Sequence, residues 1–232
     1  MAELGAGQSE VGKMIGVLQS KCKLLDQNVQ WYPERWKAQE LEEFHAAIEN
    51  LSKGCLRDGD EYRISRQNVI EFSKNAADVF IGAMIFGYGD RGYGPSRVKK
   101  ILANNSQIFD RDLQAQYEAS KNGPEASWVS HTKCAKLKFF GPAFATKFAY
   151  FGARHQKATS PIPLIADINT SWGSWELAKI PRSVEQLEGY LRYVKLAHDW
   201  GVSYGEFGAD EVERALFEIG KKYVPKKFAR IA

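Results

Sequence analysis

Two residues in the middle of the chain have types and a spacing suited to covalent chemistry. Lys147 follows a short turn at Gly141 and Pro142, and Asp167 comes twenty residues later, after the proline-containing segment 159–163. A neutral lysine amine is a nucleophile, and a carboxylate can accept its proton or stabilise positive charge on the carbon under attack. The pair therefore predicts nucleophilic catalysis by an amine with a carboxylate in support.

The sequence around Lys147 favours a neutral amine. Phe144, Phe148 and Phe151 flank it, and no acidic residue occurs in the window 126–166. We expect Lys147 at the start of a helix, where the positive end of the helix dipole disfavours an ammonium group. Burial among aromatic rings acts in the same direction, because moving a charge out of water costs free energy.

The basic residues of the chain are concentrated near this pair. The 232 residues include 32 Lys and Arg against 28 Asp and Glu, a net charge of +4. The basic residues of the acid-free window 126–166 are Lys133, Lys136, Lys138, Lys147, Arg154 and Lys157. Such a local excess favours a partner that carries phosphates. A lysine-rich solvated helix face is the alternative, and charge alone does not decide between them.

The apolar pattern predicts the elements that position these residues. Four stripes at helical spacing are Leu41, Phe44, Ile48, Leu51; Val69, Phe72, Ala76, Val79, Ala83, Phe86; Val184, Leu187, Leu191, Val194; and Val212, Ala215, Leu216, Ile219. We expect Pro33 to start the first helix and Ser65 to cap the second. Period-two alternation is sustained nowhere, so we expect no large sheet. The prediction is an all-α protein with a single unit, 1–232. It would have two helical lobes, 1–64 with 175–232 and 65–174, with a cleft between them.

Composition and motifs exclude several other classes. Hydrophobic residues make up 44% and charged residues 26% of the chain, values typical of a globular protein and not of a disordered or collagenous one. No segment reads as a signal peptide or approaches the roughly 18 apolar residues of a membrane helix. We therefore expect a cytoplasmic protein. The three cysteines and four histidines lack metal-ligand spacing, so we expect no metal and no other cofactor.

Residues 132–175 resemble the helix-hairpin-helix superfamily of DNA glycosylases, specifically its 8-oxoguanine DNA glycosylase branch. In that family a hairpin ending Gly-Thr-Lys begins a helix. A Pro-Val-Asp segment follows the lysine after about twenty residues, as Asp167 follows Lys147 here. Here Ala145-Thr146-Lys147 and Leu-Ile-Ala-Asp167 occupy the matching places, with Ala143 and Ala145 where the family has hairpin glycines. The chain also looks like the compact prokaryotic members of this fold, which lack a sheet domain.

The resemblance implies an enzyme that excises a modified base from double-stranded DNA. Lys147 would form a Schiff base with the sugar, Asp167 would assist, and β-elimination would give abasic-site lyase activity. The implied substrate is 8-oxoguanine or a bulky modified cytosine of phage DNA, the second in anti-phage defence. The resemblance also implies a monomer with a monovalent cation at the hairpin.

Other residues would contact the DNA. A flipped base needs pocket walls, for which the candidates are Phe144, Phe151 and Trp172. The candidate contacts to the DNA backbone are Gly141, Ala143, Ala145, Thr146 and Lys138 around the hairpin, with Arg91 in the glycine-rich connection 87–95 and Arg97 just after it.

Two alternatives stay open at this point. The first is a helical DNA- or partner-binding module that keeps the fold but has lost the hairpin glycines together with catalysis. The second is a helical scaffold protein in which the motif arose by chance.

Overall fold

The structure is a computed structural model that describes residues 5–38, 41–159, 161–180, 186–205 and 207–225. Over these residues the chain is mostly helical, which confirms the expected all-α class. It divides into two compact units, Leu25–Ile162 and Met1–Leu24 with Pro163–Ala232. The expected lobes, 1–64 with 175–232 and 65–174, stay a prediction. Within the described ranges, no helix has the length and apolar character needed to cross a bilayer.

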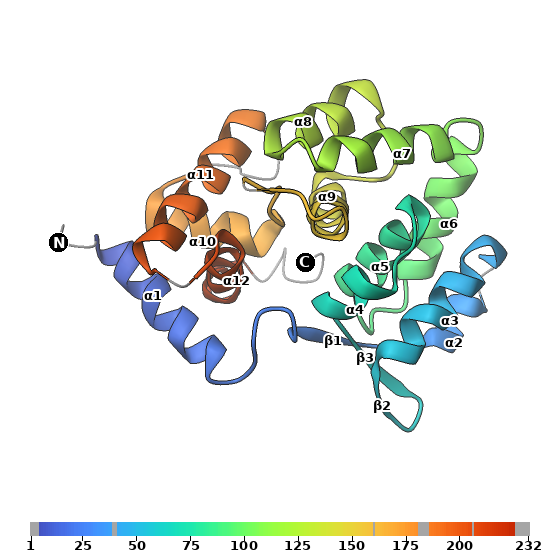
Figure 1. Cartoon of the computed structure of the whole chain (residues 1–232), viewed down its shortest axis with the longest axis horizontal. Helices are drawn as coiled ribbons and strands as arrows, with labels where there is room; N and C mark the ends of the chain where they lie inside the picture. Colours follow the sequence, from blue (N-terminus) through green and yellow to red (C-terminus); the bar gives the residue numbers. More distant parts are fainter. Residues whose placement is uncertain (1–4, 39–40, 160, 181–185, 206, 226–232) are drawn as a thin grey trace. The chain divides into compact units, whose positions relative to one another are not determined.

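The unit Leu25–Ile162 combines a small sheet with helices (Figure 1). The antiparallel strands β1 (Asn28–Trp31), β3 (Glu61–Ser65) and β2 (Leu56–Asp58) lie in that order. The helices are α2 (Pro33–Lys37), α3 (His45–Gly54), α4 (Arg66–Phe72), α5 (Ala76–Tyr88), α6 (Gly94–Asn105), α7 (Phe109–Ser120), α8 (Pro124–Val129) and α9 (Pro142–His155), with short turns η1 (Glu42–Phe44) and η2 (Ser130–Cys134).

Two helix boundaries expected from the sequence were wrong. Pro33 begins the separate helix α2, and the first apolar stripe starts at Leu41, just before η1, and continues through η1 and α3. The second stripe is divided between α4 and α5, because the side chain of Asn75 accepts a hydrogen bond from Asp78 N at 2.9 Å and starts a new helix. Ser65 does cap α4, in a reciprocal capping box with Asn68.

The core of this unit is built around α5. Nearly every residue of α5 is buried, as expected for a helix that is apolar on all sides. The helix contacts α4, α6, α7 and α9. Phe80 on α5 meets Phe109 and Phe140 edge-on, with ring centroids 5.2 and 5.4 Å apart. Since α9 packs directly on α5, residues of these two helices are held in fixed register.

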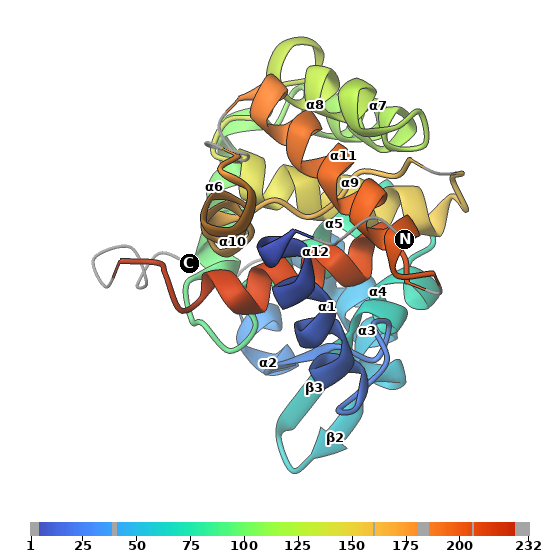
Figure 2. The same ribbon diagram turned by 90° about the vertical axis from the view of Figure 1, so that its left-hand side faces the viewer.

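In its described residues the other unit has the helices α1 (Ala6–Gln19), α10 (Ile168–Ala178), α11 (Leu187–Ser203) and α12 (Ala209–Gly220), seen in Figure 2. The apolar stripe predicted for α12 is buried, which confirms it. Helices α10 and α12 approach so closely at Gly173 and Gly220 that a Cβ on either glycine would overlap backbone atoms of the facing helix. Val184 of the third stripe lies outside the described residues.

Candidate active site

Lys147 lies in the second turn of α9. The helix begins at Pro142 with Gly141 as its N-cap, because proline is well suited to the first helical position. The expectation that Lys147 starts a helix was therefore wrong by about one turn, and the helix dipole acts mainly within the first turn. Helical side chains point back toward the N-terminus, and Lys147 Nζ accordingly lies 3.4 Å from Ala143 O. The amine is thus beside the first turn although its Cα is not.

The Lys147 side chain is almost fully enclosed. Only 8% of the residue is exposed, and Nζ lies 5.6 Å from the ring centroid of Phe144. The Phe144 ring in turn stacks on Tyr88 of α5, with centroids 4.5 Å apart and planes inclined by 22°. The Lys147 side chain is therefore packed against an aromatic pair that joins α9 to α5.

Phe151 lies one turn after Lys147 and belongs to the core. Its ring is fully buried and meets Phe86 edge-on at 5.3 Å between centroids. Phe144, by contrast, is half-buried, as is Trp172 on α10 in the other unit. Of the three candidate pocket walls, Phe144 is the one that the structure brings into contact with Lys147 within one unit. The roles of Phe151 and Trp172 stay predictions.

A turn of seven residues, 135–141, joins η2 to α9, and we call it the hairpin. The expected hairpin positions Ala143, Ala145 and Thr146 lie after it, inside α9. Polar side chains from two other helices hold its backbone. Asn105 at the end of α6 accepts from Lys138 N at 2.8 Å and donates to Lys138 O at 3.0 Å, and Gln116 on α7 donates to Ala135 O at 2.7 Å. Both are buried, so the turn is fixed by contacts from outside its own sequence.

We predict that Asn105→Ala loosens this turn. Loss of the two bonds to Lys138 leaves partly buried backbone groups without partners, which costs about 2 kcal/mol of unfolding free energy. Urea unfolding measures this, and DNA affinity should fall with it. The neighbouring exposed residue gives a matched control, because Asn104→Ala should change stability by less than about 0.5 kcal/mol. Equal effects of the two substitutions would show that the Asn105 side chain does not hold the turn.

Phe139 stands at the exposed tip of the same turn. It has a left-handed backbone, φ 65°, which is uncommon for a residue with a side chain. The residue is 42% exposed, and its ring centroid lies 4.1 Å from Lys100 Nζ on α6. Lys138 next to it is also exposed, so the tip presents an aromatic ring and two lysines to solvent.

His131 on η2 supports the hairpin as a neutral residue. Burial, with a smaller effect of the Lys136 charge, lowers its pKa to about 4. Nδ1 is buried, and no described residue within hydrogen-bonding distance pairs with it. The ring meets Phe140 edge-on at 6.0 Å. Its protonation would place a charge beside the core.

The shifted pKa of His131 predicts a loss of stability in mild acid. The unfolded chain binds a proton near its ordinary pKa of about 6.5, whereas the folded protein does so only near 4, so stability falls as the pH drops through this interval. We expect His131 to contribute a loss of about 2 kcal/mol between about pH 7.5 and 5. Denaturant unfolding at several pH values measures it. His131→Leu should flatten the profile, and an unchanged profile would refute the assignment.

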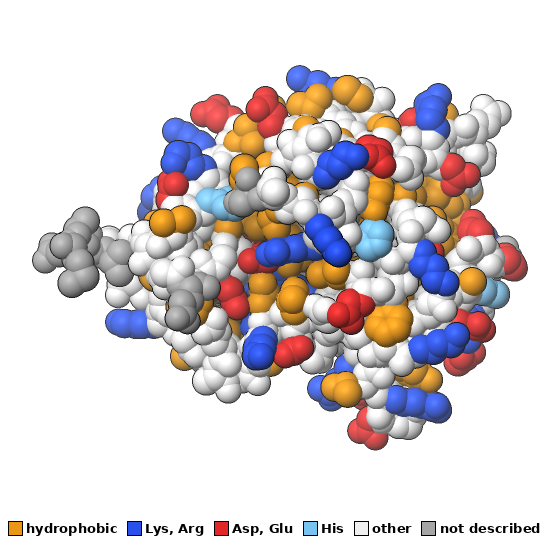
Figure 3. Space-filling model, viewed as in Figure 1, with side chains coloured by type: hydrophobic (Ala, Val, Ile, Leu, Met, Phe, Trp, Pro, Cys, Tyr) orange, Lys and Arg blue, Asp and Glu red, His pale blue; other side chains and the backbone are white. Residues whose placement is uncertain are grey.

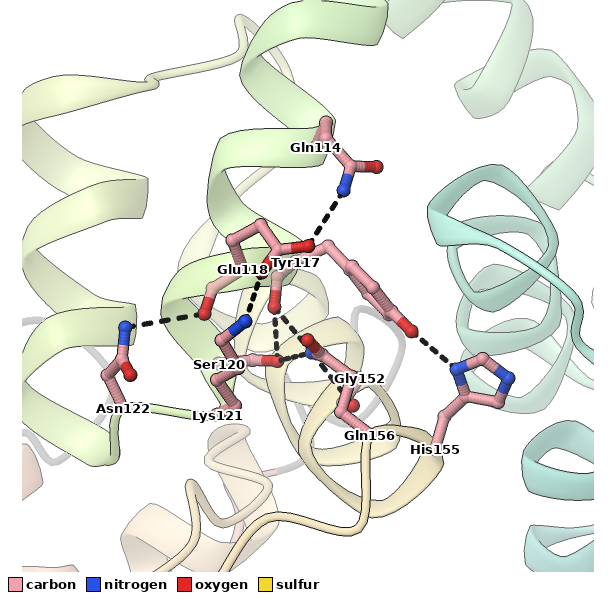
Figure 4. Close-up of polar contacts among 9 residues, drawn as sticks. All are labelled: Gln114, Tyr117, Glu118, Ser120, Lys121, Asn122, Gly152, His155 and Gln156. Atoms are coloured by element: carbon pink, nitrogen blue, oxygen red, sulfur yellow. Dashed lines mark hydrogen bonds and ion pairs between the residues drawn. The ribbon is translucent and has the colours of Figure 1, made fainter.

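The far end of α9 is tied to α7 by a polar network (Figure 4). Tyr117 Oη lies 2.5 Å from His155 Nδ1, and His155 Nε2 lies 2.9 Å from Ser73 O. The carbonyl accepts from Nε2, so His155 links Ser73 to Tyr117 through its two ring nitrogens. Gln156 donates to Tyr117 O and Ser120 Oγ at 2.7 and 2.9 Å. The helix that carries Lys147 is therefore held at both ends.

Asp167 belongs to the other unit, where it is the N-cap of α10. Its Oδ1 accepts from Asn169 N at 3.0 Å and Thr170 N at 3.1 Å, and Thr170 Oγ1 accepts from Asp167 N at 2.7 Å. These bonds fix the carboxyl group at a helix N-terminus, where a negative charge is favoured.

The segment before Asp167 is held by two tyrosines of α11. Tyr190 Oη donates to Leu164 O at 3.1 Å and accepts from Leu164 N at 3.2 Å, and Tyr193 Oη donates to Ile165 O at 2.8 Å. Burial raises the pKa of Tyr190, so its hydroxyl keeps the proton it donates. The sequence signal was weak, because both tyrosines occupy the apolar face of α11 and resemble ordinary core residues.

The remaining predicted DNA-contact residues lie at the hairpin and at the glycine-rich connection. Gly141, Lys138 and Arg91 are exposed. Arg97 is half-buried and its Nε donates to Tyr88 Oη at 3.4 Å. Ala143 is half-buried, whereas Ala145 and Thr146 are buried; all three lie within α9.

Charge on the surface is mixed. Figure 3 shows Lys and Arg interspersed with Asp and Glu on the face that it draws. Four basic residues of the acid-free window are exposed: Lys133, Lys136, Lys138 and Lys157. Among the described residues, no three His, Cys, Asp or Glu side chains gather as metal ligands would.

Comparison with known proteins identifies a family. Residues 23–217 match the family described as "Putative 8-oxoguanine DNA glycosylase OGG-like protein". The match extends over most of both compact units and includes Lys147 and Asp167. No curated protein and no solved structure matches the chain.

Proposed function

Because the chain belongs to the 8-oxoguanine DNA glycosylase OGG-like family, we propose that it excises a modified base from double-stranded DNA by forming a Schiff base with Lys147. The observation that carries the proposal is the enclosure of Lys147, which is 8% exposed and lies against the ring of Phe144. Lysine is rarely buried to this degree, so an enclosed lysine is a candidate for chemistry.

The proposed reaction proceeds in two stages. In the first, the neutral Lys147 amine attacks C1′ of the deoxyribose, and the N-glycosidic bond breaks with its electron pair leaving on the base, which takes up a proton. Opening of the sugar ring then gives an imine between Nζ and C1′. In the second stage, loss of a proton from C2′ expels the 3′ phosphate and nicks the strand, and hydrolysis of the imine frees Lys147.

Asp167 is proposed to act on the same sugar as an ionised carboxylate. It would accept the proton that the attacking amine loses and would stabilise the positive charge that develops at C1′. Support comes from its capping geometry, since two backbone N–H groups of α10 hold Oδ1 in place. Preorganised charge of this kind needs no rearrangement at the moment of reaction.

The flipped base is proposed to stack on aromatic side chains. Phe144 is half-buried beside Lys147, and Trp172 is half-buried one turn after Asp167. Every base offers a flat face for stacking, so these residues set affinity rather than identity. The substrate is proposed to be 8-oxoguanine or a bulky modified cytosine of phage DNA. In the second case the protein would act in anti-phage defence.

A screen for released bases tests the proposed function. The protein is incubated with duplexes that each contain one modified base, namely 8-oxoguanine, an oxidised pyrimidine, a methylated purine or a glucosylated hydroxymethylcytosine. Mass spectrometry detects the free base, and borohydride reduces any Schiff base to a stable protein–DNA adduct. We expect release and an adduct with at least one of these duplexes.

A second candidate function is a DNA-binding module without catalysis. The observation that favours it is the placement of Ala143 and Ala145 inside α9, in place of glycines that would let a phosphate approach the backbone closely. Such a module would bind every duplex with an affinity that falls steeply with salt concentration. It would release no base from any of them and give no adduct.

A further inference from the structure

The last two residues of α5, Gly87 and Tyr88, contact the residues around the proposed nucleophile. A Cβ on Gly87 would overlap the ring of Phe144 and would come within 3.2 Å of Lys147 Cδ. Tyr88 stacks on the same Phe144 ring, with the two ring centroids 4.5 Å apart. Both helices belong to the same compact unit.

We propose that Gly87 and Tyr88 are positioning residues for the Schiff-base chemistry of Lys147. Gly87 leaves the space that the Phe144 ring and the lysine stem occupy, and Tyr88 holds that ring in its plane. The inference rests on the proposed function, because it assigns a role to residues that act through Lys147.

The backbone gives no reason for a glycine at position 87. The residue is helical, and a left-handed φ first occurs two residues later, at Gly89 with φ 56°. Glycine is unfavourable inside a helix, since it loses the most conformational freedom on folding. A glycine is therefore required at position 87 because side chains of α9 fill the space beside it, and a larger residue would have to displace those side chains.

Tyr88 is itself held from the side of α6. Its ring meets Tyr93 edge-on at 5.0 Å, its Oη accepts from Arg97 Nε at 3.4 Å, and Gly94 packs against its Cβ. Burial raises the pKa of its hydroxyl, so it stays neutral beside the arginine. Residues at the start of α6 and just before it therefore hold Tyr88, and Tyr88 packs on Phe144.

The position of the amine depends on this arrangement. The lysine stem passes beside Gly87, and its Nζ lies 3.4 Å from Ala143 O. Small displacements of a nucleophile lower the rate of attack by large factors. Substitution at Gly87 should consequently affect the chemical step more than DNA binding.

The experiment uses the full chain and duplex DNA with a preformed abasic site, so that the identity of the lesion does not matter. Borohydride trapping at saturating DNA gives the rate of Schiff-base formation, and a binding titration gives the dissociation constant. We expect Gly87→Ala to slow trapping by a factor of about 10 to 100, with the dissociation constant and unfolding midpoint nearly unchanged. Gly16→Ala is the matched control, because Gly16 lies inside α1 and a Cβ there meets nothing within 4 Å.

Two further variants separate positioning from general damage to the fold. Tyr88→Phe keeps the stacked ring and should trap at nearly the wild-type rate, whereas Tyr88→Leu should be slowed like Gly87→Ala. With the ring removed, Gly87→Ala/Phe144→Leu should be no slower than Phe144→Leu alone. A normal trapping rate in Gly87→Ala, with an active wild-type protein, overturns the inference and leaves the function standing. Absence of any adduct in the wild type overturns both.

Discussion

Replacing Lys147 by glutamine should abolish the covalent adduct and lower base release by at least about a thousandfold. Glutamine cannot form an imine, so no Schiff base can be reduced by borohydride. The substitution suits the site sterically, because an amide can still donate to Ala143 O as Nζ does at 3.4 Å. We therefore expect the variant to fold and to bind DNA, and trapping on abasic-site duplex is the measurement.

Lys138→Gln is the matched control for this prediction. Lys138 is an exposed lysine of the hairpin, and its loss removes at most one contact to a phosphate. The adduct should form normally, while the slope of log affinity against log salt concentration becomes shallower by about one unit. An adduct that persists in Lys147→Gln would show that another amine is the nucleophile.

Replacing Asp167 by asparagine should lower base release by about a hundredfold or more while leaving the fold intact. Asparagine is as good an N-cap as aspartate, and its side-chain oxygen can accept the bonds from Asn169 N and Thr170 N. The variant therefore removes the negative charge without removing the cap. Single-turnover excision measures the first effect and thermal unfolding the second, for which we expect a change within about 0.5 kcal/mol.

Asp167→Ala provides the comparison, because it removes both the charge and the cap. It should match Asp167→Asn in excision but lose about 1 kcal/mol more stability. If Asp167→Asn excises normally, the carboxylate serves only to cap α10. Normal excision by both Asp167→Asn and Lys147→Gln would show that the chemistry resides elsewhere in the chain.

Several features of the fold followed from local sequence. The stripe on α12 and the residues Leu41, Ile48 and Leu51 are buried as their periodicity predicted, and Ser65 caps α4. Such features depend on neighbours three or four positions away, which a single sequence displays directly.

Other features had no local signal. Helix α12 buries four charged residues, which are Asp210, Glu211, Glu213 and Arg214. Charged residues are rarely buried unless they are paired, so sequence alone does not predict this. Asn105 follows Val98 and Ile101 on the buried face of α6. A polar residue at this position of an apolar stripe could have marked it as buried. Its partner at Lys138 could not have been named, because that partner is 33 positions away.

The sequence by itself determined the helical class, the family likeness and the two residue types, Lys147 and Asp167, on which the proposed chemistry depends. The tertiary structure alone decided that Lys147 is enclosed, that Phe151 packs in the core and that Gly87 and Tyr88 abut the Phe144 ring. The physical reason is that burial and steric fit arise only when helices that are distant in sequence pack together. Each of these contacts joins a residue of α5 to a residue of α9, so neither segment of sequence shows it alone.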